Sequence, residues 1–225
     1  MSSLIRSFKL VLAPPHPAGR PFLLTAAVIA VIGKLLGRRF AWLSTGGTWF
    51  AAFCLYFFRD PKRVAPTRTG AVVAPADGHV VSIEEVAPPA ELGIGTVPVC
   101  RVAIFLSVLD VHVNRMPVSA TVTRTVYHHG RFLNASLDKA SEQNERNALA
   151  LRLADGRQMA VVQIAGLIAR RILCDAIEGD SFVTGERFGI IRFGSRTDLY
   201  LPPGLRPLVS VGQRTIAGET VIAQL

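Results

Sequence analysis

The dipeptide Gly194-Ser195 interrupts RFGSRTDLYLP, residues 192–202, whose apolar-polar alternation is typical of a β-strand. Glycine weakens a strand interior unless a bulge or a close backbone approach requires it. A serine hydroxyl can attack the carbonyl group of the preceding residue and convert the amide to an ester, given a strained bond, a base and oxyanion donors. Gly194 would ease that attack because glycine has no Cβ and tolerates unusual φ and ψ angles. The pair therefore marks either a bend in a strand or a peptide bond that the chain itself breaks.

Breaking this bond would create a reactive carbonyl group. β-Elimination of the ester would leave dehydroalanine at position 195, and hydrolysis would then leave a pyruvoyl group at a new chain N-terminus. Such a ketone can form a Schiff base with a substrate amine and accept electrons during decarboxylation, as pyridoxal phosphate does. A Gly-Ser dipeptide is common, so this interpretation depends on the motifs around it.

Four motifs in series resemble the phosphatidylserine decarboxylase family. They are APADGHV at 74–80, FLSVLDVHVNRMPV at 105–118, NER at 144–146 and GERFGIIRFGSRTDLYLP at 185–202. The resemblance spreads over about residues 55–225, and the short chain is similar to the compact form of the family. It implies a proenzyme that cuts itself into residues 1–194 and 195–225, with Ser195 becoming the pyruvoyl cofactor. The matured enzyme would convert phosphatidylserine to phosphatidylethanolamine and carbon dioxide in phospholipid biosynthesis.

The resemblance also implies roles for individual residues. Asp77 stands at the PADG aspartate, which orients the base of an Asp-His-Ser self-cleavage triad. His112 stands at the first histidine of the segment D-x-H-x-x-H-x-P, which is associated with decarboxylation, and Asp110 at its leading aspartate. Without the resemblance, Asp77 reads as a turn residue and His112 as a hydrogen-bonded histidine of a core or surface.

The base that activates Ser195 is left open. The second histidine of the family segment is Arg115 here, and arginine cannot act as a base because its pKa is about 12 or higher. Either His112 serves both steps or the base comes from another histidine, for which the candidates are His79, His128 and His129. The usual LGST is FGSR in this chain, which preserves the cleavage pair.

The pattern from Ala71 onward predicts a mainly β (α+β) fold. Runs of β-branched residues alternate with turn dipeptides, including Asp77-Gly78 and a hairpin about Asp155-Gly156. The stretches APADGHVVSI, 74–83, and SVGQRTIAGETVIAQL, 210–225, look like the half-motifs of the barrel-sandwich hybrid fold. Neither turn holds a lysine for a lipoyl or biotinyl group, which excludes a carrier role. The polar stretch 134–147 could form a short helix or a loop.

The N-terminal part of the chain predicts a hydrophobic helical hairpin. Two apolar stretches, 21–37 and 40–58, flank the basic residues Lys34, Arg38 and Arg39, and the second has 19 residues without a charge. Because about 20 residues cross a bilayer as a helix, we expect a membrane-associating segment over 1–58 and leave spanning open. A basic linker, 59–70, and a catalytic β domain, 71–225, would follow. In the linker, Arg59, Lys62 and Arg63 either bind lipid phosphate or are merely juxtamembrane.

Charge and cysteine content narrow the partners. The formal charge of +9 and the pI near 10.3 suit an anionic lipid such as phosphatidylserine. No basic stripe interleaved with aromatic residues predicts nucleic-acid binding. Three scattered cysteines predict reduced thiols, and His128-His129 lacks a neighbouring ligand set, so no metal is expected. We expect the inner cell membrane, with the catalytic domain on the cytoplasmic side and the two cleavage products associated. A homo-oligomer stays open.

Two other functions fit parts of this pattern. A pyruvoyl decarboxylase of a soluble amino acid would use the same chemistry, but the hydrophobic N-terminus argues against it. A non-enzymatic, membrane-tethered β adaptor with the hybrid fold would leave the chain intact and would not need Ser195.

Overall fold

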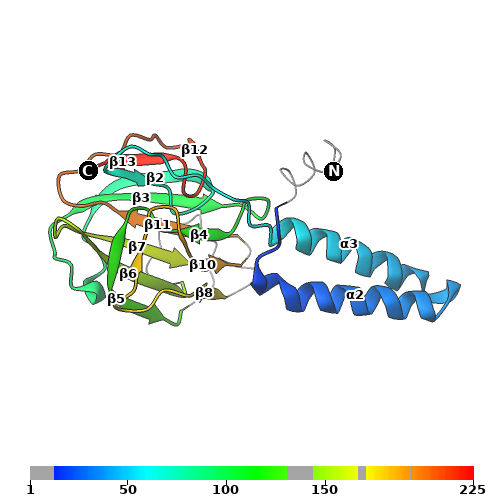
Figure 1. The fold of residues 1–225 in the computed structure, drawn as a ribbon. Helices are drawn as coiled ribbons and strands as arrows, with labels where there is room; N and C mark the ends of the chain where they lie inside the picture. Colours follow the sequence, from blue (N-terminus) through cyan, green and yellow to red (C-terminus); the bar gives the residue numbers. More distant parts are fainter. Residues whose placement is uncertain (1–12, 131–143, 167–170, 193) are drawn as a thin grey trace. The chain divides into compact units, whose positions relative to one another are not determined.

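The structure is a computed structural model that describes residues 13–130, 144–166, 171–192 and 194–225. Residue contacts divide the chain into a helical unit, Met1–Lys62, and a β unit, Arg63–Leu225 (Figure 1). The boundary at Lys62 falls inside the basic stretch 59–70 that was predicted as a linker. The predicted mainly β fold with an N-terminal helical hairpin is confirmed.

The helical unit is an antiparallel pair of helices. Helices α2, Arg20–Leu35, and α3, Ala41–Phe57, are preceded by the short 3-10 helices η1, Pro17–Gly19, and η2, Arg38–Phe40. The two axes approach closely at Gly47, where a Cβ atom would lie 2.6 Å from the backbone nitrogen of Ala30. Small residues at such a crossing let two helices pack backbone against backbone.

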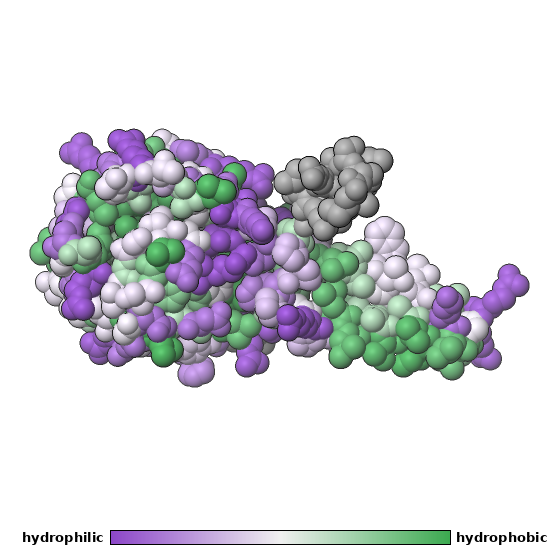
Figure 2. Space-filling model, in the orientation of Figure 1, coloured by the Kyte–Doolittle hydropathy of each residue, from purple (hydrophilic) through white to green (hydrophobic). Residues whose placement is uncertain are grey.

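The outer surface of this helical pair is apolar. Large side chains including Leu24, Val31, Trp42 and Trp49 are exposed. In Figure 2 a continuous hydrophobic strip follows the lower edge of the helical pair, and hydrophilic residues gather at one end. The helical span Pro17–Leu35 is long and apolar enough to cross a membrane, judged by length and composition alone. Only 17% of its most apolar window is buried, whereas the core helix of a soluble protein is mostly buried.

The β unit is built on an eight-stranded sheet in which every neighbouring pair is antiparallel. Its order is β12-β2-β3-β11-β7-β6-β5-β9. The strands are β2 Gly78–Val86, β3 Val99–Leu106, β5 Ala120–His128, β6 Arg146–Leu153, β7 Gln158–Ile164, β9 Ser181–Phe182, β11 Ser195–Tyr200 and β12 Arg214–Thr215. Strands β6 and β7 form the hairpin predicted about Asp155-Gly156.

Two smaller sheets complete the unit, which also holds the 3-10 helix η3, Ala90–Leu92. One has the order β4-β10-β8 and consists of Val113–Arg115, Arg187–Ile191 and Ile172–Cys174. The other pairs β1, Ala71–Val73, with β13, Val221–Gln224. The Asp77-Gly78 turn therefore does not close a hairpin, because β1 pairs with the C-terminal strand and β2 with β3 and β12. In the polar stretch 134–147, residues 134–143 lie outside the described residues, and 146–147 begin β6.

Strand β11 runs through the middle of the large sheet, between β3 and β7, and all six of its residues are buried. Side chains alternate between the faces of a strand. Ser195, Thr197 and Leu199 therefore share one face, on which Leu199 joins the main core. Arg196, Asp198 and Tyr200 share the other face, on which Tyr200 joins a second cluster with Leu92 of η3.

Candidate active site

The Gly194-Ser195 pair lies at the junction of two sheets, not in the interior of a strand. Strand β10 ends at Ile191 and β11 begins at Ser195, so the pair closes the short connection between them. Gly194 has a φ angle of +63°, in the left-handed region that favours glycine, and a Cβ there would meet nothing within 4 Å. Backbone conformation, and not lack of space, therefore explains the glycine.

The Ser195 hydroxyl is buried without a hydrogen-bond partner among the described residues. The side chain of Ser195 is fully buried. Burying a hydroxyl without a partner costs about 1–3 kcal/mol, so such a group in a native core calls for an explanation. A hydroxyl kept free for reaction with the neighbouring carbonyl group is a chemical explanation.

His112 lies next to this junction and is also fully buried. The backbone nitrogen of Ile191 donates to the His112 carbonyl at 3.2 Å, which brings residue 112 beside the end of β10. The His112 Nδ1 atom lies 3.0 Å from the backbone oxygen of Asp110. Because a carbonyl oxygen only accepts hydrogen bonds, Nδ1 carries the proton in the neutral ring and Nε2 carries the basic lone pair.

Two further observations connect the neighbours of His112 to the region of Ser195. Asn114, two residues after His112, donates from Nδ2 to Thr197 Oγ1 at 3.4 Å, and Thr197 shares a face with Ser195. Asp110, two residues before His112, follows the end of β3, where Leu106 pairs with Ser195. The segment 110–114 is thus tied to β11 through Asn114 and Thr197, two residues after His112 and Ser195 respectively.

Asp110 organises the loop before His112. Its Oδ2 accepts from the backbone nitrogen of Ser107 at 2.9 Å and from the Ser107 hydroxyl at 2.6 Å. Its Oδ1 accepts from Arg214 at 3.3 Å. The carboxylate therefore holds the loop while the backbone carbonyl orients the imidazole. Sequence reasoning missed Ser107 and Arg214, although Ser107 lies in one of the quoted motifs.

Asp77 contacts two segments of the β unit that are distant in the sequence. Its Oδ1 accepts from the backbone nitrogen of Ala217 at 2.8 Å, and its Oδ2 accepts from Arg63 at 2.7 Å. Arg63, which the sequence left between lipid binding and a juxtamembrane position, is thus the ion-pair partner of Asp77. Arg115 lies in the same region, where its Nη1 donates to the Gly185 carbonyl at 3.0 Å, and a Cβ on Gly218 would lie 3.0 Å from its Cδ.

The other candidate bases lie farther from Ser195. His79 is exposed and pairs in register with Phe105, which pairs with Arg196, so it lies on the opposite face of the sheet from Ser195. His128 is on β5, three strands from β11, or about 14 Å at a strand spacing of about 4.8 Å, and its Nε2 lies 3.1 Å from Glu91. His129 is 90% exposed, with Nδ1 3.9 Å from Glu145.

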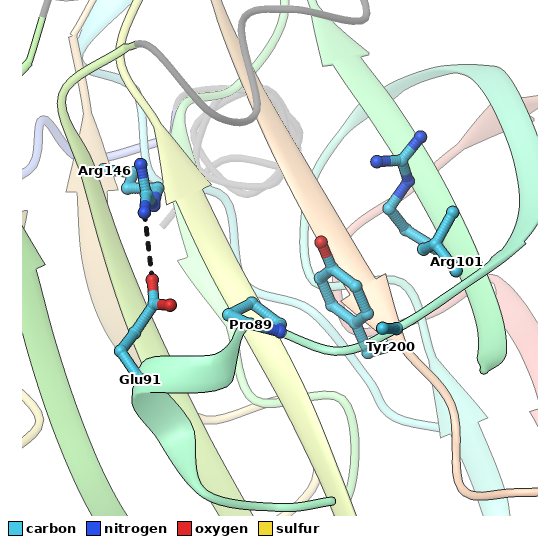
Figure 3. Close-up of a pocket in the computed structure, with 7 residues that line it drawn as sticks. Pro89, Glu91, Arg101, Arg146 and Tyr200 are labelled. Carbon is cyan, nitrogen blue, oxygen red and sulfur yellow. Dashed lines mark hydrogen bonds and ion pairs between the residues drawn. The ribbon is translucent and has the colours of Figure 1, made fainter. Parts of the chain in front are cut away.

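A pocket of about 270 Å³ opens on the face of the large sheet that carries Arg196 and Tyr200, opposite to Ser195. Its lining residues are Val86, Ala87, Pro89, Glu91, Arg101, Arg146 and Tyr200. Figure 3 shows Arg101 beside the Tyr200 ring, across from Arg146, which is bonded to Glu91 at 3.1 Å. Tyr200 and Ser195 lie at positions of opposite parity on β11, so this pocket does not open onto the Ser195 hydroxyl. The three residues of the NER motif have different partners. Asn144 donates to the Ala165 carbonyl, Glu145 accepts from the Tyr127 hydroxyl, and Arg146 bonds to Glu91.

Charged side chains differ between the pocket side of the sheet and the cleavage junction. On the pocket side, Arg196 and Asp198 form a fully buried bidentate pair, with bonds of 2.6 and 3.1 Å. At the cleavage junction, burial and then the nearby charge of Arg171 lower the pKa of Arg192. Arg192 is two residues before Gly194, and a positive charge near the Gly194 carbonyl would favour a negative charge that develops on its oxygen. Within the described ranges, no three histidine, cysteine or acidic side chains gather as a metal site.

Comparison with known proteins links this site to one family. The profile of the phosphatidylserine decarboxylase family matches residues 50–223. A phosphatidylserine decarboxylase proenzyme of Gluconacetobacter diazotrophicus is 69% identical over 224 residues, covering 99% of this chain and 100% of the relative. The proenzyme of that name from Granulibacter bethesdensis is 65% identical, covering 99% and 90%, and one from Mycobacterium tuberculosis is 51% identical, covering 99% and 93%.

Proposed function

The chain belongs to the phosphatidylserine decarboxylase family and is a carboxy-lyase, and on this premise we propose that it makes its own pyruvoyl cofactor from Ser195. The observation that carries the proposal is the buried Ser195 hydroxyl, without a partner among the described residues, directly after Gly194 with φ +63°. A group formed from the chain itself needs no separate binding pocket, so these residues fit the cofactor.

Maturation begins when Ser195 Oγ attacks the carbonyl carbon of Gly194. The C–N bond breaks and an ester forms, while the hydroxyl proton passes to a base. Removal of the Ser195 Cα proton then expels the Gly194 carboxylate and leaves dehydroalanine. Addition of water releases the nitrogen as ammonia, and the new chain N-terminus carries the ketone. The products are residues 1–194 and 195–225.

We assign the base role to His112. Its Nδ1 proton is held by the Asp110 carbonyl, so Nε2 is the atom that accepts the Ser195 proton. Asp110 orients this ring through its backbone, and Ser107 and Arg214 hold Asp110 in turn. Asp77 supports the neighbouring turn through Ala217 and Arg63, and Arg115 is a supporting residue through the Gly185 carbonyl. His79, exposed on the opposite face, has no role in this scheme. The positive charge of Arg192 and Arg171 would stabilise the oxyanion on Gly194.

In the matured protein, the pyruvoyl ketone supplies an electrophile for the substrate amine and an electron sink for the loss of carbon dioxide. The chain's own residues would manage protons and water. His112 Nε2, once protonated, would deliver its proton to the substrate carbon that has lost the carboxylate. The burial of His112 and of position 195 would exclude water from that carbon.

The proposed substrate is phosphatidylserine, and the proposed product is phosphatidylethanolamine for phospholipid biosynthesis. The exposed apolar surface of α2 and α3 supports association with a membrane. We place the protein at the anionic inner cell membrane, with the β unit on the cytoplasmic side. The two cleavage products would stay together, a homo-oligomer stays open, and neither a metal nor a nucleic acid enters this scheme.

The intact mass of the purified protein under denaturing conditions tests the proposal. The wild type should give two fragments, with the smaller one spanning 195–225 and carrying a ketone that reacts with hydroxylamine. Ser195→Ala should stay whole, and Ser210→Ala, an exposed serine of the same fragment, should be cut normally. A wild type that stays whole after prolonged incubation with membranes would refute the pyruvoyl mechanism and favour the intact adaptor.

A further inference from the structure

Three buried side-chain amides form a continuous chain of hydrogen bonds that ends at Thr197, two residues after Ser195. Asn147 Nδ2 donates to Gln163 Oε1 at 3.2 Å, and Gln163 Nε2 donates to Asn114 Oδ1 at 2.9 Å. Asn114 Nδ2 then donates to Thr197 Oγ1 at 3.4 Å and to the Pro75 carbonyl at 3.5 Å. We call Asn147, Gln163 and Asn114 the amide relay.

The direction of the relay follows from its last acceptor. The Pro75 carbonyl can only accept, so the Asn114 NH2 group must face it and Asn114 Oδ1 must face Gln163. That orientation requires the Gln163 NH2 group to face Asn114, and its oxygen to face Asn147. One backbone carbonyl thus orients all three amides, and aligned bonds of this kind strengthen one another.

The relay joins the two sheets that carry the proposed reacting groups. Asn147, Gln163 and Thr197 lie on β6, β7 and β11 of the large sheet, and Asn114 lies on β4 of the small sheet. Ser195 is two residues before Thr197, and His112 is two residues before Asn114. Among the described residues, the side-chain hydrogen bond that Thr197 makes across this gap is the one from Asn114.

A glycine of β10 makes room for the relay. A Cβ atom at Gly189 would lie 3.0 Å from Gln163 Nε2 and 2.4 Å from the Leu173 carbonyl oxygen. Gly189 pairs with Asn114 of β4 in the same sheet, so three strands meet at this point. The space at position 189 is therefore shaped for the Gln163 amide as well as for the sheet.

Stability alone does not explain these polar groups. The relay residues and Thr197 are each at most 1% exposed, and their neighbours on the same face include Leu149, Val161 and Leu199. Well-packed apolar side chains of similar volume often stabilise a core as well as buried polar groups do. What apolar side chains lack is direction, because hydrogen bonds fix the register of two surfaces and dispersion contacts tolerate sliding.

We propose that the amide relay is a positioning device for self-cleavage, which holds Thr197 and hence Ser195 level with His112. This proposal rests on the proposed function, since it concerns the same bond. Gln163 acts through Asn114, and Asn114 acts through Thr197. None of the three touches the reacting atoms in the structure, so they are positioning residues.

The test is the self-cleavage rate of full-length proenzyme made by cell-free synthesis with lipid vesicles. Gln163→Met keeps the approximate volume and removes both relay bonds, and it should slow cleavage about 100-fold, as misplacement of reacting groups by about 1 Å can do. Val161→Ala is the matched control, two residues away on the same strand and face. It removes packing and leaves the relay, so its rate should stay within about threefold of wild type. Rates are compared at a temperature at which circular dichroism shows every variant folded.

A second variant separates positioning from packing. The neutral acid in Gln163→Glu can donate to Asn114 and accept from Asn147, whereas its ionised form would set two acceptors against each other. Relative to wild type, its cleavage rate should therefore be near normal at low pH and fall as pH rises, while Gln163→Met stays slow throughout. Among the described residues, the titratable groups near the relay are Cys174, which contacts Asn147 and whose pKa burial raises, and His112, two residues before Asn114. Both are present in every variant.

The outcomes separate this proposal from the proposed function. If the wild type itself stays whole, the pyruvoyl mechanism is refuted and the relay with it. If the wild type is cut and Gln163→Met is cut as fast as Val161→Ala, only the relay proposal is overturned. The relay proposal is also overturned if Gln163→Glu is cut at the wild-type rate at every pH.

Discussion

At the residue scale, the site depends on which nitrogen of one histidine is basic. The Asp110 carbonyl fixes the Nδ1 proton of His112 and leaves Nε2 as the acceptor. The same Asp110 binds Ser107 and Arg214 through its carboxylate. A single residue, Asp110, thus sets both the position of the loop and the tautomer of the His112 ring.

We expect His112→Ala to abolish decarboxylation and to slow self-cleavage at least about 100-fold, because general-base catalysis typically contributes 10²–10⁴-fold. His79→Ala, which changes an exposed histidine on the other face of the sheet, should have little effect. Gel separation of the two chains measures cleavage, and release of labelled carbon dioxide measures decarboxylation. Full activity in a purified, fully processed His112→Ala protein would remove His112 from the mechanism.

The raised pKa of Tyr200 predicts that the free energy of unfolding falls at alkaline pH. Burial raises its pKa to about 12, and the Asp198 carboxylate adds to this. Because an unfolded tyrosine titrates near 10, the native state holds this proton more tightly than the unfolded state does. Its contribution is fully present below about pH 10 and is lost as pH rises toward 12, for a total of about 3 kcal/mol.

Denaturant unfolding in detergent at pH 9 and pH 11 measures this effect. The free energy of unfolding should fall with pH in the wild type, and Tyr200→Phe should remove about 1–2 kcal/mol of that fall. Tyr56→Phe, in the helical unit, should leave the fall unchanged. Equal pH dependence in wild type and Tyr200→Phe would contradict the prediction.

At the element scale, the helical pair depends on a close crossing. A Cβ at Gly47 would collide with the backbone of Ala30 at 2.6 Å, whereas a Cβ at the neighbouring Gly46 would meet nothing within 4 Å. Two adjacent glycines in α3 therefore have opposite tolerances, which makes them a matched pair for experiment.

We expect Gly47→Leu to separate α2 from α3 and to lower the thermal midpoint of the helical signal at 222 nm by several degrees or more. Gly46→Leu should keep the wild-type midpoint or raise it, since leucine has a higher helix propensity than glycine by about 1 kcal/mol. Both are measured in the same detergent. If the two variants melt alike, the close crossing does not hold the hairpin together.

At the scale of the whole molecule, self-cleavage would leave the small chain deeply embedded. Residues 195–225 contain β11, which pairs with β3 and β7 on its two sides. They also contain β12 and β13, which pair with β2 and β1. Every strand of the small chain is thus bonded to a strand of the large chain. The covalent bond at Gly194 is one link among many.

The cleaved protein should therefore run as one species in size-exclusion chromatography and separate only in denaturant. Asp198→Ala removes the bidentate carboxylate partner of the buried Arg196 and should destabilise this association by about 3–5 kcal/mol. Asp155→Ala breaks an exposed ion pair with Arg157 and is the control, with an expected effect within about 1 kcal/mol. Spontaneous release of the 195–225 fragment from the wild type in native buffer would contradict the prediction.

The sequence by itself determined the features that depend on near neighbours. The apolar stretches 21–37 and 40–58 predicted the helical hairpin, and the turn chemistry of Asp155-Gly156 predicted the β6–β7 hairpin. The motif series around Gly194-Ser195 predicted the family. Each of these signals is local, because helix periodicity, turn dipeptides and motif spacing are written in consecutive residues.

Only the tertiary structure decided which distant residues meet. Four histidines of the β unit were candidates, and the sheet register separates His112 from His79, since a shift of one residue turns a side chain to the opposite face. The same holds for Arg63 with Asp77, and for Gln163 with Asn114, which is 49 residues away. Such contacts depend on how strands pair and sheets pack, and that pairing is set by the cooperative burial of the whole core, which no short stretch of sequence contains.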